Sequence, residues 1–223
     1  MEKKQKGTLK DQVYQKIIEE ICAGRLTPDN IFTEGQMIEH FGVSKAPVRE
    51  ALVQLCHENV LRSIPRCGYQ VIQISTKTVH DLTELRILLE VGSLPAVMQH
   101  MDAETLQVFK KMNHDRAIGA ENRDIWTAWH NNLAYHLQLN EVAQNSQVTY
   151  ALEHALSACT RAYAQGYRNQ RQLAAAAKPG EHVHDKIINA LEKGDLETAK
   201  EALTNDIIEM EKLLLEFPNS QIS

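Results

Sequence analysis

Residues 33–71 read TEGQMIEHFGVSKAPVREALVQLCHENVLRSIPRCGYQV, and this stretch decides the fold of the first part of the chain. Thr33 is placed to cap a short helix, and Gln36 three residues later completes a capping box. Gly42 predicts the end of that helix, and Ser44 is positioned to cap a second one. Two short helices joined by a tight glycine-containing turn are typical of a helix-turn-helix, whose second helix enters the major groove of DNA.

The second of these helices combines an apolar face with a polar first turn. Lys45 and Arg49 lie in or next to that first turn, where they can contact base edges or phosphates. Apolar residues recur at helical spacing on the opposite side, which predicts a face buried against a core. These apolar residues are Val48, Ala51, Leu52 and Leu55.

A predicted β-hairpin follows the two helices. Val60–Ile64 is a short apolar run, Pro65–Gly68 is a turn, and Tyr69–Ile74 alternates apolar and polar residues. Arg66 lies at the tip, where it can reach a phosphate or the minor groove. A hairpin in this position is the wing of a winged helix-turn-helix.

The string GVSKAPVREAL at residues 42–52, with the Arg-x-Gly hairpin tip at residues 66–68, resembles the GntR family of bacterial transcription regulators. The resemblance covers residues 8–74 and implies that this part of the chain binds double-stranded operator DNA. The residues that it implicates in DNA binding are Ser44, Lys45, Ala46, Pro47, Arg49, Arg62, Arg66 and Gly68.

Composition is that of an ordinary soluble protein with room for two domains. The chain has 223 residues, of which 43% are hydrophobic and 24% charged. The charged start MEKKQKG is not followed by an apolar run, and no stretch approaches the ~18 apolar residues of a membrane span. We therefore expect neither a signal peptide nor a membrane partner. The four cysteines have no paired spacing, and a reducing cytoplasm is the expected location.

The net charge of −5 is unevenly divided along the chain. Residues 1–75 hold ten Lys and Arg against nine Asp and Glu (+1), whereas the remainder holds 14 against 20 (−6). The first part is only weakly basic, so non-specific attraction to DNA should be modest. We therefore predict that a homodimer binds DNA through sequence-specific contacts.

We predict a mostly α fold with two domains, a winged helix-turn-helix at residues 1–75 and an antiparallel all-helical bundle at residues 76–223. Leu9, Val13 and Ile17 recur every four residues, which predicts a helix that ends at Gly24 and packs behind the recognition helix. After residue 75 the strand patterns disappear. Helices are then predicted at residues 76–100 (with a kink or break at Pro95), 103–119, 123–143, 146–172, 179–193 and 195–216.

Three segments of the second part resemble the FCD ligand-binding domain of FadR-type GntR regulators. They are ELRILLE (84–90), NLAYHLQLNEVAQN (132–145) and HDKIINALEKGDLETAKEAL (184–203). In that family an Asp and three His hold a divalent metal, and the resemblance places these ligands at Asn132, His136, His184 and Asp206.

This chain departs from the family at two of these positions. Asn132 replaces the usual acid, and Asp206 replaces the last histidine. Two imidazoles, a carboxylate and an amide oxygen still form a ligand set for Zn, Ni or Mn, although a weaker one. With ten histidines in the chain, surface or ordinary core histidines are the plainer interpretation, so the metal stays open.

A buried Arg86 needs an anion, and two are available. Glu90 lies one turn away and can form an ordinary intrahelical pair, whereas the resemblance implies that Arg86 reaches a carboxylate effector. Tyr135, Asn132 and Arg161 are further candidates for binding this effector. We expect it to be a small carboxylate or a sugar acid.

These observations predict a DNA-binding transcriptional regulator that is not an enzyme. Effector binding, directly or through a metal, would change operator affinity reciprocally, with relief of repression as the expected sense. One alternative is a metal-dependent enzyme built on His136, His184 and Asp206, which predicts turnover that is unaffected by substitution of Lys45. The other is an architectural DNA-binding dimer, which is excluded if a metabolite shifts DNA affinity at fixed salt.

Overall fold

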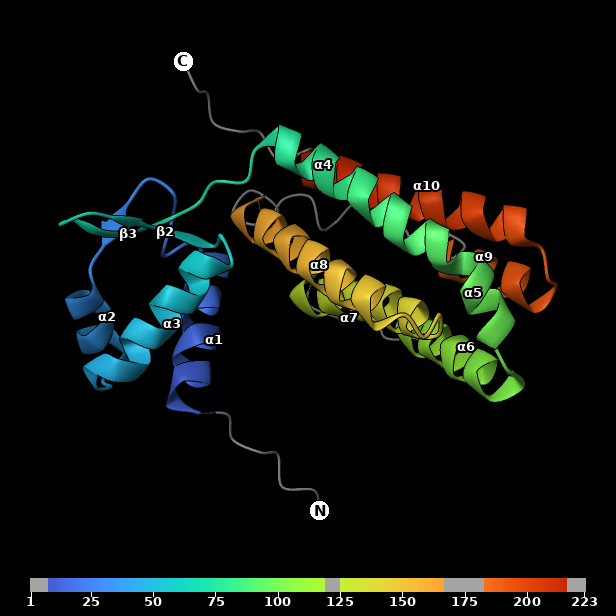
Figure 1. The fold of residues 1–223 in the computed structure, drawn as a ribbon, viewed down its shortest axis with the longest axis horizontal. Coiled ribbons are helices and arrows are strands. Elements are labelled where there is room, and N and C mark those ends of the chain that lie inside the picture. Colours follow the sequence, from blue (N-terminus) through green and yellow to red (C-terminus); the bar gives the residue numbers. More distant parts are fainter. Residues whose placement is uncertain (1–7, 119–124, 167–182, 216–223) are drawn as a thin grey trace. The chain divides into compact units, whose positions relative to one another are not determined.

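The computed structural model describes residues 8–118, 125–166 and 183–215 of the chain. The chain divides into two compact units, one built mainly from residues before Ser75 and the other mainly from those that follow (Figure 1). Each unit has its own hydrophobic core. Within the described ranges, no helix has both the length and the apolar character to cross a membrane.

The first unit is a winged helix-turn-helix, as predicted. Its strands form an antiparallel sheet in the order β1-β3-β2, and Arg62 on β2 lies opposite Gln70 on β3. The short first strand was not predicted, because two residues are too few to show an alternating pattern. The elements are α1 (Leu9–Cys22), β1 (Ile31–Phe32), α2 (Glu34–Phe41), α3 (Lys45–His57), β2 (Leu61–Ile64) and β3 (Gly68–Val71).

Local sequence sets the ends of α2 and the start of α3. The Thr33 hydroxyl accepts from the backbone N–H of Gln36, whose side chain accepts from the N–H of Thr33 at 2.8 Å, so the capping box is confirmed. Gly42 ends α2 with a left-handed backbone (φ 65°). Ser44 occupies the cap position of α3, but the predicted side-chain cap is wrong. The third residue of α3 is Pro47, which has no N–H to donate.

The core of this unit joins α1 to the recognition helix α3. Val13 and Ile17 of α1 are buried together with Val48 and Leu52 of α3. This confirms the prediction that the first helix packs behind the recognition helix. The hairpin closes tightly onto β1. A Cβ atom at Gly68 would lie 2.3 Å from the carbonyl oxygen of Phe32, and Gly68 has φ 139°.

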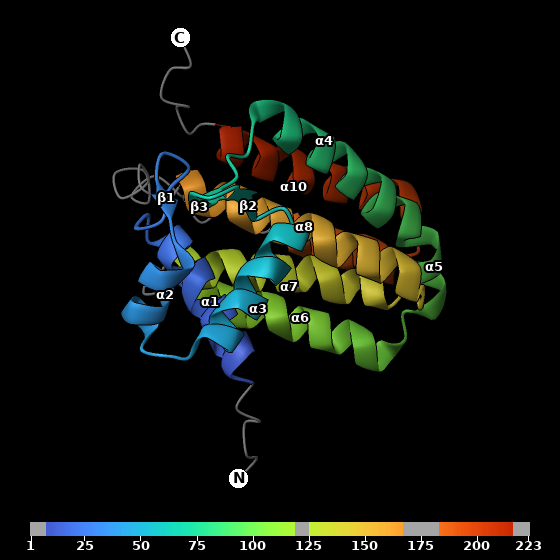
Figure 2. The same ribbon diagram turned by 60° about the vertical axis from the view of Figure 1, so that its left-hand side comes forward.

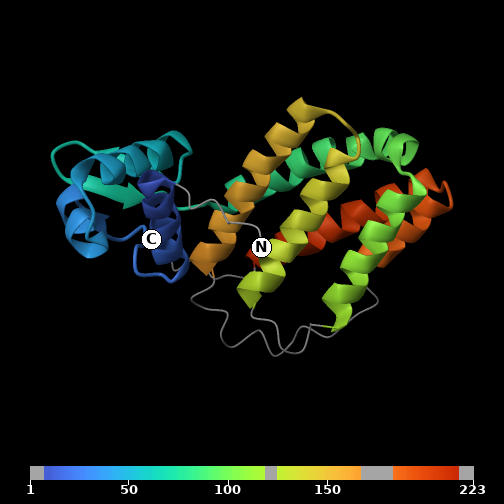
Figure 3. The same ribbon diagram turned by 90° about the horizontal axis from the view of Figure 1, so that it is seen from below.

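The second unit is the predicted antiparallel helical bundle. Figures 2 and 3 show α6, α7 and α8 side by side, with α4 and α10 lying alongside each other. The predicted helix ends that fall on described residues agree with the observed ones to within a few residues, whereas the predicted ends at residues 119, 123, 172, 179 and 216 fall outside the described ranges. The helices are α4 (Thr76–Arg86), α5 (Gly92–His100), α6 (Ala103–Ile118), α7 (Ile125–Glu141), α8 (Ser146–Gly166), α9 (Val183–Glu192) and α10 (Leu196–Leu215).

The predicted helix at residues 76–100 is interrupted, but not at Pro95. A π-helical turn, η1 (Ile87–Val91), joins α4 to α5, and Pro95 lies inside α5. The proline ring clashes with the carbonyl four residues earlier, which is that of Val91. The wider turn of η1 ends at that residue, so the irregularity lies one turn upstream of the proline.

The core of the bundle is apolar but also holds buried polar side chains. Leu94 of α5, Leu139 of α7, Ile187 of α9 and Leu203 of α10 are all fully or almost fully buried. Charged and polar side chains are nevertheless buried in the same unit. They are Arg86, Glu90, Asn113, His136, Asn140 and His184, together with Thr83 and Ser93.

Candidate functional site

The start of α3 presents a polar surface. Lys45 Nζ lies 3.5 Å from Glu34 Oε1 on α2, while the lysine side chain remains 69% exposed. Such an exposed pair is weak and leaves the ammonium able to turn to a phosphate. Of the residues predicted to bind DNA from this helix, Ser44, Lys45, Ala46 and Arg49 are exposed and Pro47 is half-buried.

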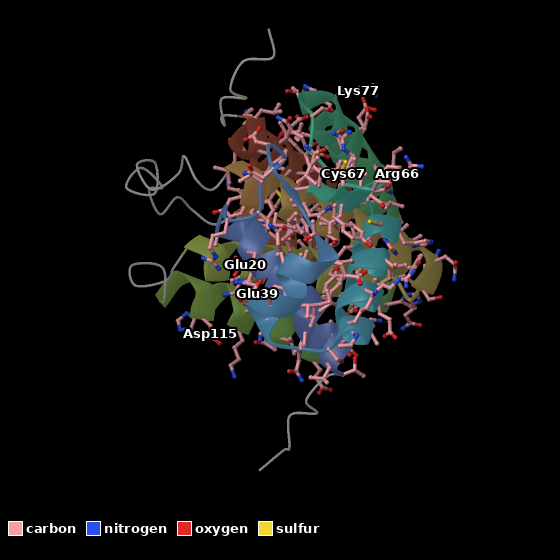
Figure 4. All side chains as sticks on the ribbon, turned by 90° about the vertical axis from the view of Figure 1, so that its left-hand side faces the viewer. Glu20, Glu39, Arg66, Cys67, Lys77 and Asp115 are labelled. Carbon is pink, nitrogen blue, oxygen red and sulfur yellow. The ribbon has the colours of Figure 1, made fainter. Side chains whose placement is uncertain are left out.

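The wing carries two arginines, of which one is hydrogen-bonded within the hairpin and the other is exposed at its tip. Nε and Nη2 of Arg62 both donate to Oε1 of Gln70, at 2.9 and 2.7 Å, and Gln70 Nε2 donates to the carbonyl of Pro28. Arg66 is exposed between β2 and β3 with a left-handed backbone (φ 63°). Figure 4 labels Arg66 beside Cys67 on the surface of this unit. Arg66 is therefore exposed at the tip of the wing, whereas the guanidinium of Arg62 is bonded within the hairpin.

A relay of charged side chains runs through the interior of the second unit. Arg86 Nε donates to Glu90 Oε1 at 2.7 Å, and Glu90 Oε2 lies 2.6 Å from Nδ1 of His136. The three side chains are at most 2% exposed. Buried charges are tolerated when each meets an opposite charge, so Glu90 stabilises both of its neighbours.

Three side chains from α7, α9 and α10 converge next to this relay. Nε2 of His136 lies 2.9 Å from Oδ2 of Asp206, and Nε2 of His184 lies 3.2 Å from the same oxygen. One ligand atom from each residue lies within 4.8 Å of the other two. Donors ~2.0–2.2 Å from a tetrahedral Zn lie about 3.3 Å apart, so this spacing fits a shared cation.

The orientation of His136 supports the same interpretation. Its Nε2 atom is buried, and the approach to Asp206 lacks hydrogen-bond alignment, so Nε2 has no hydrogen-bond partner among the residues described. A buried ring nitrogen in this state needs an explanation, and a metal ligand is one. Its Nδ1 atom contacts Glu90, and a metal-binding histidine usually has a carboxylate or carbonyl at the ring nitrogen that faces away from the metal, which fixes the orientation of the ring.

Burial and charge act in opposite directions on the titration of this cluster. Burial would raise the pKa of Glu90, but His136 and Arg86 hold it below its usual value. Burial would lower the pKa of His136, yet Glu90 and Asp206 raise it. Burial would raise the pKa of Asp206, whereas the adjacent imidazoles of His136 and His184 lower it. The two carboxylates therefore shift His136 toward its protonated form relative to a free imidazole.

The other predicted site residues surround the cluster. Tyr135 is buried and stacks on His184 with ring centroids 3.7 Å apart. Asn132 is half-buried on α7, one turn before His136 and on the same helical face. Arg161 is half-buried on α8, where Nη1 donates to the Ser157 hydroxyl at 3.1 Å. The structure thus brings together His136, His184 and Asp206 of the predicted metal ligands.

Two functional candidates were missed by the sequence. Glu90 was considered a partner of Arg86 alone, because its contact with His136 spans 46 positions and depends on helix packing. Asn140 was not considered, although it lies four residues after His136 and so on the same face of α7. Asn140 is buried. The four-residue spacing from His136 is the sequence feature that could have identified Asn140 as a candidate.

Comparison with known proteins follows the division of the chain. Residues 9–71 match the family of bacterial regulatory proteins described as gntR, and residues 81–208 match the FCD domain. A helix-turn-helix transcriptional regulator of Bacillus subtilis is 29% identical over 147 residues, which is 64% of this chain and 64% of that protein.

Two further relatives have named operons. A probable D-xylose utilization operon transcriptional repressor of Paenarthrobacter nicotinovorans is 29% identical over 207 residues, covering 90% of this chain and 86% of that protein. The gluconate operon transcriptional repressor of Bacillus subtilis is 36% identical over 70 residues, covering 31% of this chain and 28% of that protein.

Solved structures share the fold over almost the whole chain. Escherichia coli McbR/YncC matches with a TM-score of 0.74 at 18% identity, covering 95% of this chain and 99% of that one. A GntR regulator from a Rhodococcus species matches with a TM-score of 0.66 at 16% identity, covering 93% and 97%. At such identities these matches establish the architecture of the chain.

Proposed function

The chain belongs to the GntR family of bacterial transcriptional regulators with an FCD domain, and we propose that it is a repressor whose operator affinity falls when a small organic acid binds inside the helical unit. One observation carries the sensing half of this proposal. His136, His184 and Asp206 converge in the interior beside Arg86, whose guanidinium is not fully engaged.

In this proposal α3 occupies the major groove of the operator. Lys45 and Arg49 contact base edges or phosphates, and their exposure supports these roles. The Ser44 hydroxyl makes no capping bond and can bond the DNA backbone instead. Arg66 at the wing tip reaches a phosphate or the minor groove.

A homodimer would place two copies of α3 in successive major grooves of a pseudo-palindromic site. Apolar side chains on the surface of the helical unit favour such an assembly. Leu88 in η1 is 74% exposed, and Leu85 lies three residues earlier on the same side of the helix with 39% exposure. Burial of exposed leucines by a second copy is favourable.

We assign a divalent cation (Zn, Ni or Mn) to His136, His184 and Asp206, with Asn132 as a further oxygen donor. Two imidazoles and a carboxylate on separate helices suit these metals. The single carboxylate ligand comes from Asp206 on α10, which compensates for the amide at Asn132 on α7. Such an ion, when bound, would accept an oxygen atom of the effector.

Arg86 supports an acid as the effector. Its Nε atom is used by Glu90, but Nη2 is buried and has no hydrogen-bond partner among the residues described. A buried guanidinium N–H favours an incoming carboxylate oxygen. Tyr135, Asn132 and Arg161 are the other residues that we assign to effector binding. The relatives named as repressors of D-xylose and gluconate operons favour a sugar acid.

Effector and operator binding are linked in this proposal. An acid that favours one arrangement of the two recognition helices weakens operator binding, and the operator weakens acid binding by the same factor. The family indicates regulation rather than catalysis, and no step of this proposal requires turnover.

The test uses the full-length protein and an operator selected from random DNA. A thermal-shift screen with small carboxylates and sugar acids is run with added Zn or Ni and again with chelator, and each hit is tested for operator release at fixed salt. We expect an acid that raises the Tm with metal present and weakens operator binding. An acid that works equally well in chelator would contradict the metal, and the absence of any operator-releasing acid would contradict the sensing role.

A further inference from the structure

Asn140 carries a buried amide that makes no side-chain hydrogen bond to the residues that the structure describes. The residue is 3% exposed, and neither Oδ1 nor Nδ2 has a hydrogen-bond partner within the described part of the chain. Two other buried polar side chains of the bundle each make a hydrogen bond. Asn113 Nδ2 donates to Asp185 at 2.9 Å, and the Ser93 hydroxyl donates to the carbonyl of Leu89 at 2.6 Å. Because native cores rarely keep a wholly unsatisfied amide, Asn140 calls for a partner beyond those that the described residues supply.

Asn140 lies on the helical face that carries the candidate metal ligands. Asn132, His136 and Asn140 follow one another at intervals of four residues, so their side chains form one stripe along α7. A helix rises 1.5 Å per residue, which puts Asn140 about 6 Å along the axis from His136. Leu139 and Ala143 beside it belong to the apolar core. The amide is therefore an isolated polar group one turn beyond the cluster.

We propose that Asn140 recognises a hydroxyl group of the effector, which is therefore a hydroxy acid rather than a simple carboxylic acid. This inference rests on the proposed function, because it requires an acid held at Arg86 or at the histidine–aspartate cluster. Neither polar atom of the Asn140 amide has a partner among the described residues, so the complementary group must both donate and accept. A hydroxyl does so, whereas a second carboxylate only accepts and an ammonium only donates.

The spacing also limits the size of the ligand. If the acid group lies at the level of His136, its hydroxyl is about 6 Å farther along α7. An extended chain of roughly four to six carbons covers that span. An acid of this length without the hydroxyl would leave the Asn140 amide buried and unbonded, and sites of this kind reject such analogues strongly.

Isothermal titration with matched acids tests this inference. The pairs, each of which differs by one hydroxyl group, are 4-hydroxybutyrate with butyrate and malate with succinate. They are titrated into metal-loaded wild type, Asn140→Leu and the control Asn189→Leu, which changes an exposed asparagine on α9. We expect wild type to bind the hydroxylated member of at least one pair about tenfold tighter or more. Asn140→Leu should bring that ratio close to one without weakening the other member, and Asn189→Leu should keep it. Asn140→Ala serves as a second variant should Asn140→Leu fold poorly.

The possible outcomes separate this inference from the proposed function. Equal binding of both members by wild type overturns the role of Asn140 and leaves acid sensing in place. An unchanged ratio in Asn140→Leu also overturns it and makes an ordered water the partner of the amide. Failure of wild type to bind any acid overturns both proposals together.

Discussion

The carboxylate of Glu90 lies 2.6 Å from Nδ1 of His136, in a contact between η1 and α7 that is closed to solvent. Its other oxygen accepts a hydrogen bond from Arg86 at 2.7 Å. One carboxylate therefore orients an imidazole and neutralises a guanidinium. Because Nδ1 is held in this way, Nε2 of His136 faces Asp206. The position of a candidate metal-ligand atom thus depends on a residue outside the ligand set.

Glu90→Gln is expected to weaken both metal binding and folding. The amide keeps the shape of the side chain but removes the charge, which leaves Arg86 and His136 as buried cations. Metal affinity should fall ~10–100-fold, and the free energy of unfolding by up to about 3–5 kcal/mol. Competition with a chromogenic chelator and urea unfolding measure the two effects. Glu84→Gln changes an exposed residue of α4 and should alter neither.

Chelator-treated protein should be most stable in mildly acidic solution. The pKa of His136 is raised by folding, so its stabilisation is complete below about 6.5 and is lost as pH rises through the folded pKa. The pKa values of Glu90 and Asp206 are lowered, so their stabilisation is present above about 4 and is lost as pH falls. Urea unfolding between pH 3 and 9 measures this profile.

Saturating Zn should remove the alkaline decline, because metal binding requires neutral histidine. The chelator-treated variant His136→Gln should lose the alkaline decline for a different reason, since the titrating imidazole is gone. Stability in chelator that rises steadily from pH 6 to 9 would be incompatible with an imidazolium at His136.

Arg49→Ala should weaken operator binding by about 1–3 kcal/mol if Arg49 reads a base with two hydrogen bonds. Fluorescence anisotropy with selected operator and scrambled DNA measures the loss and its sequence dependence. Arg25→Ala is the matched control, because Arg25 is exposed in the same unit and bonded to Glu20. Equal operator affinities of Arg49→Ala and wild type would remove Arg49 from the contact surface.

Gly68→Ala should destabilise the winged helix unit. The added Cβ would meet the Phe32 carbonyl oxygen at 2.3 Å, and alanine rarely adopts φ 139°. We expect a loss of at least about 1–3 kcal/mol in urea unfolding, since β1 must move away from β3. Gly35→Ala in the exposed part of α2 should instead gain about 0.5–1 kcal/mol. Equal stability of Gly68→Ala and Gly35→Ala would show that the hairpin accommodates a Cβ atom at residue 68.

Leu88→Glu should shift the protein from dimer to monomer. A charge at this exposed position would be buried without a partner if a second copy covers it. Sedimentation equilibrium over a concentration series measures the shift, and Val108→Glu on α6 is the control at another exposed apolar residue. If Leu88→Glu dimerises as tightly as Val108→Glu, the interface lies on another face.

The winged helix unit was predictable because its signals are local. Thr33 with Gln36, and Gly42, act within a few residues, so the helix boundaries follow from capping chemistry alone. The same local reasoning failed at Ser44, where Pro47 removes the N–H that the cap would have used. Helix boundaries in the second unit followed from periodicity for similar reasons.

The interior site was only partly predictable. His136, His184 and Asp206 were identified by resemblance, and their convergence depends on how three helices pack. Local spacing pointed to the Arg86–Glu90 pair, but not to the second bond from Glu90 to His136. Glu90 lies in the π-helical turn, which leaves no periodic trace in a sequence of five residues.

The π-helical turn also bears on how this chain can change in length. A turn of this kind holds one residue more than an α-helical turn, and the extra residue bulges without rotating its flanks. Deletion of one residue between Ile87 and Val91 would therefore restore a continuous α-helix, with α4 and α5 keeping their inward faces. The same deletion within α4 would rotate the preceding residues by about 100° against the bundle. Length variation among related chains is thus expected to concentrate at η1, at the cost of moving Glu90 away from His136.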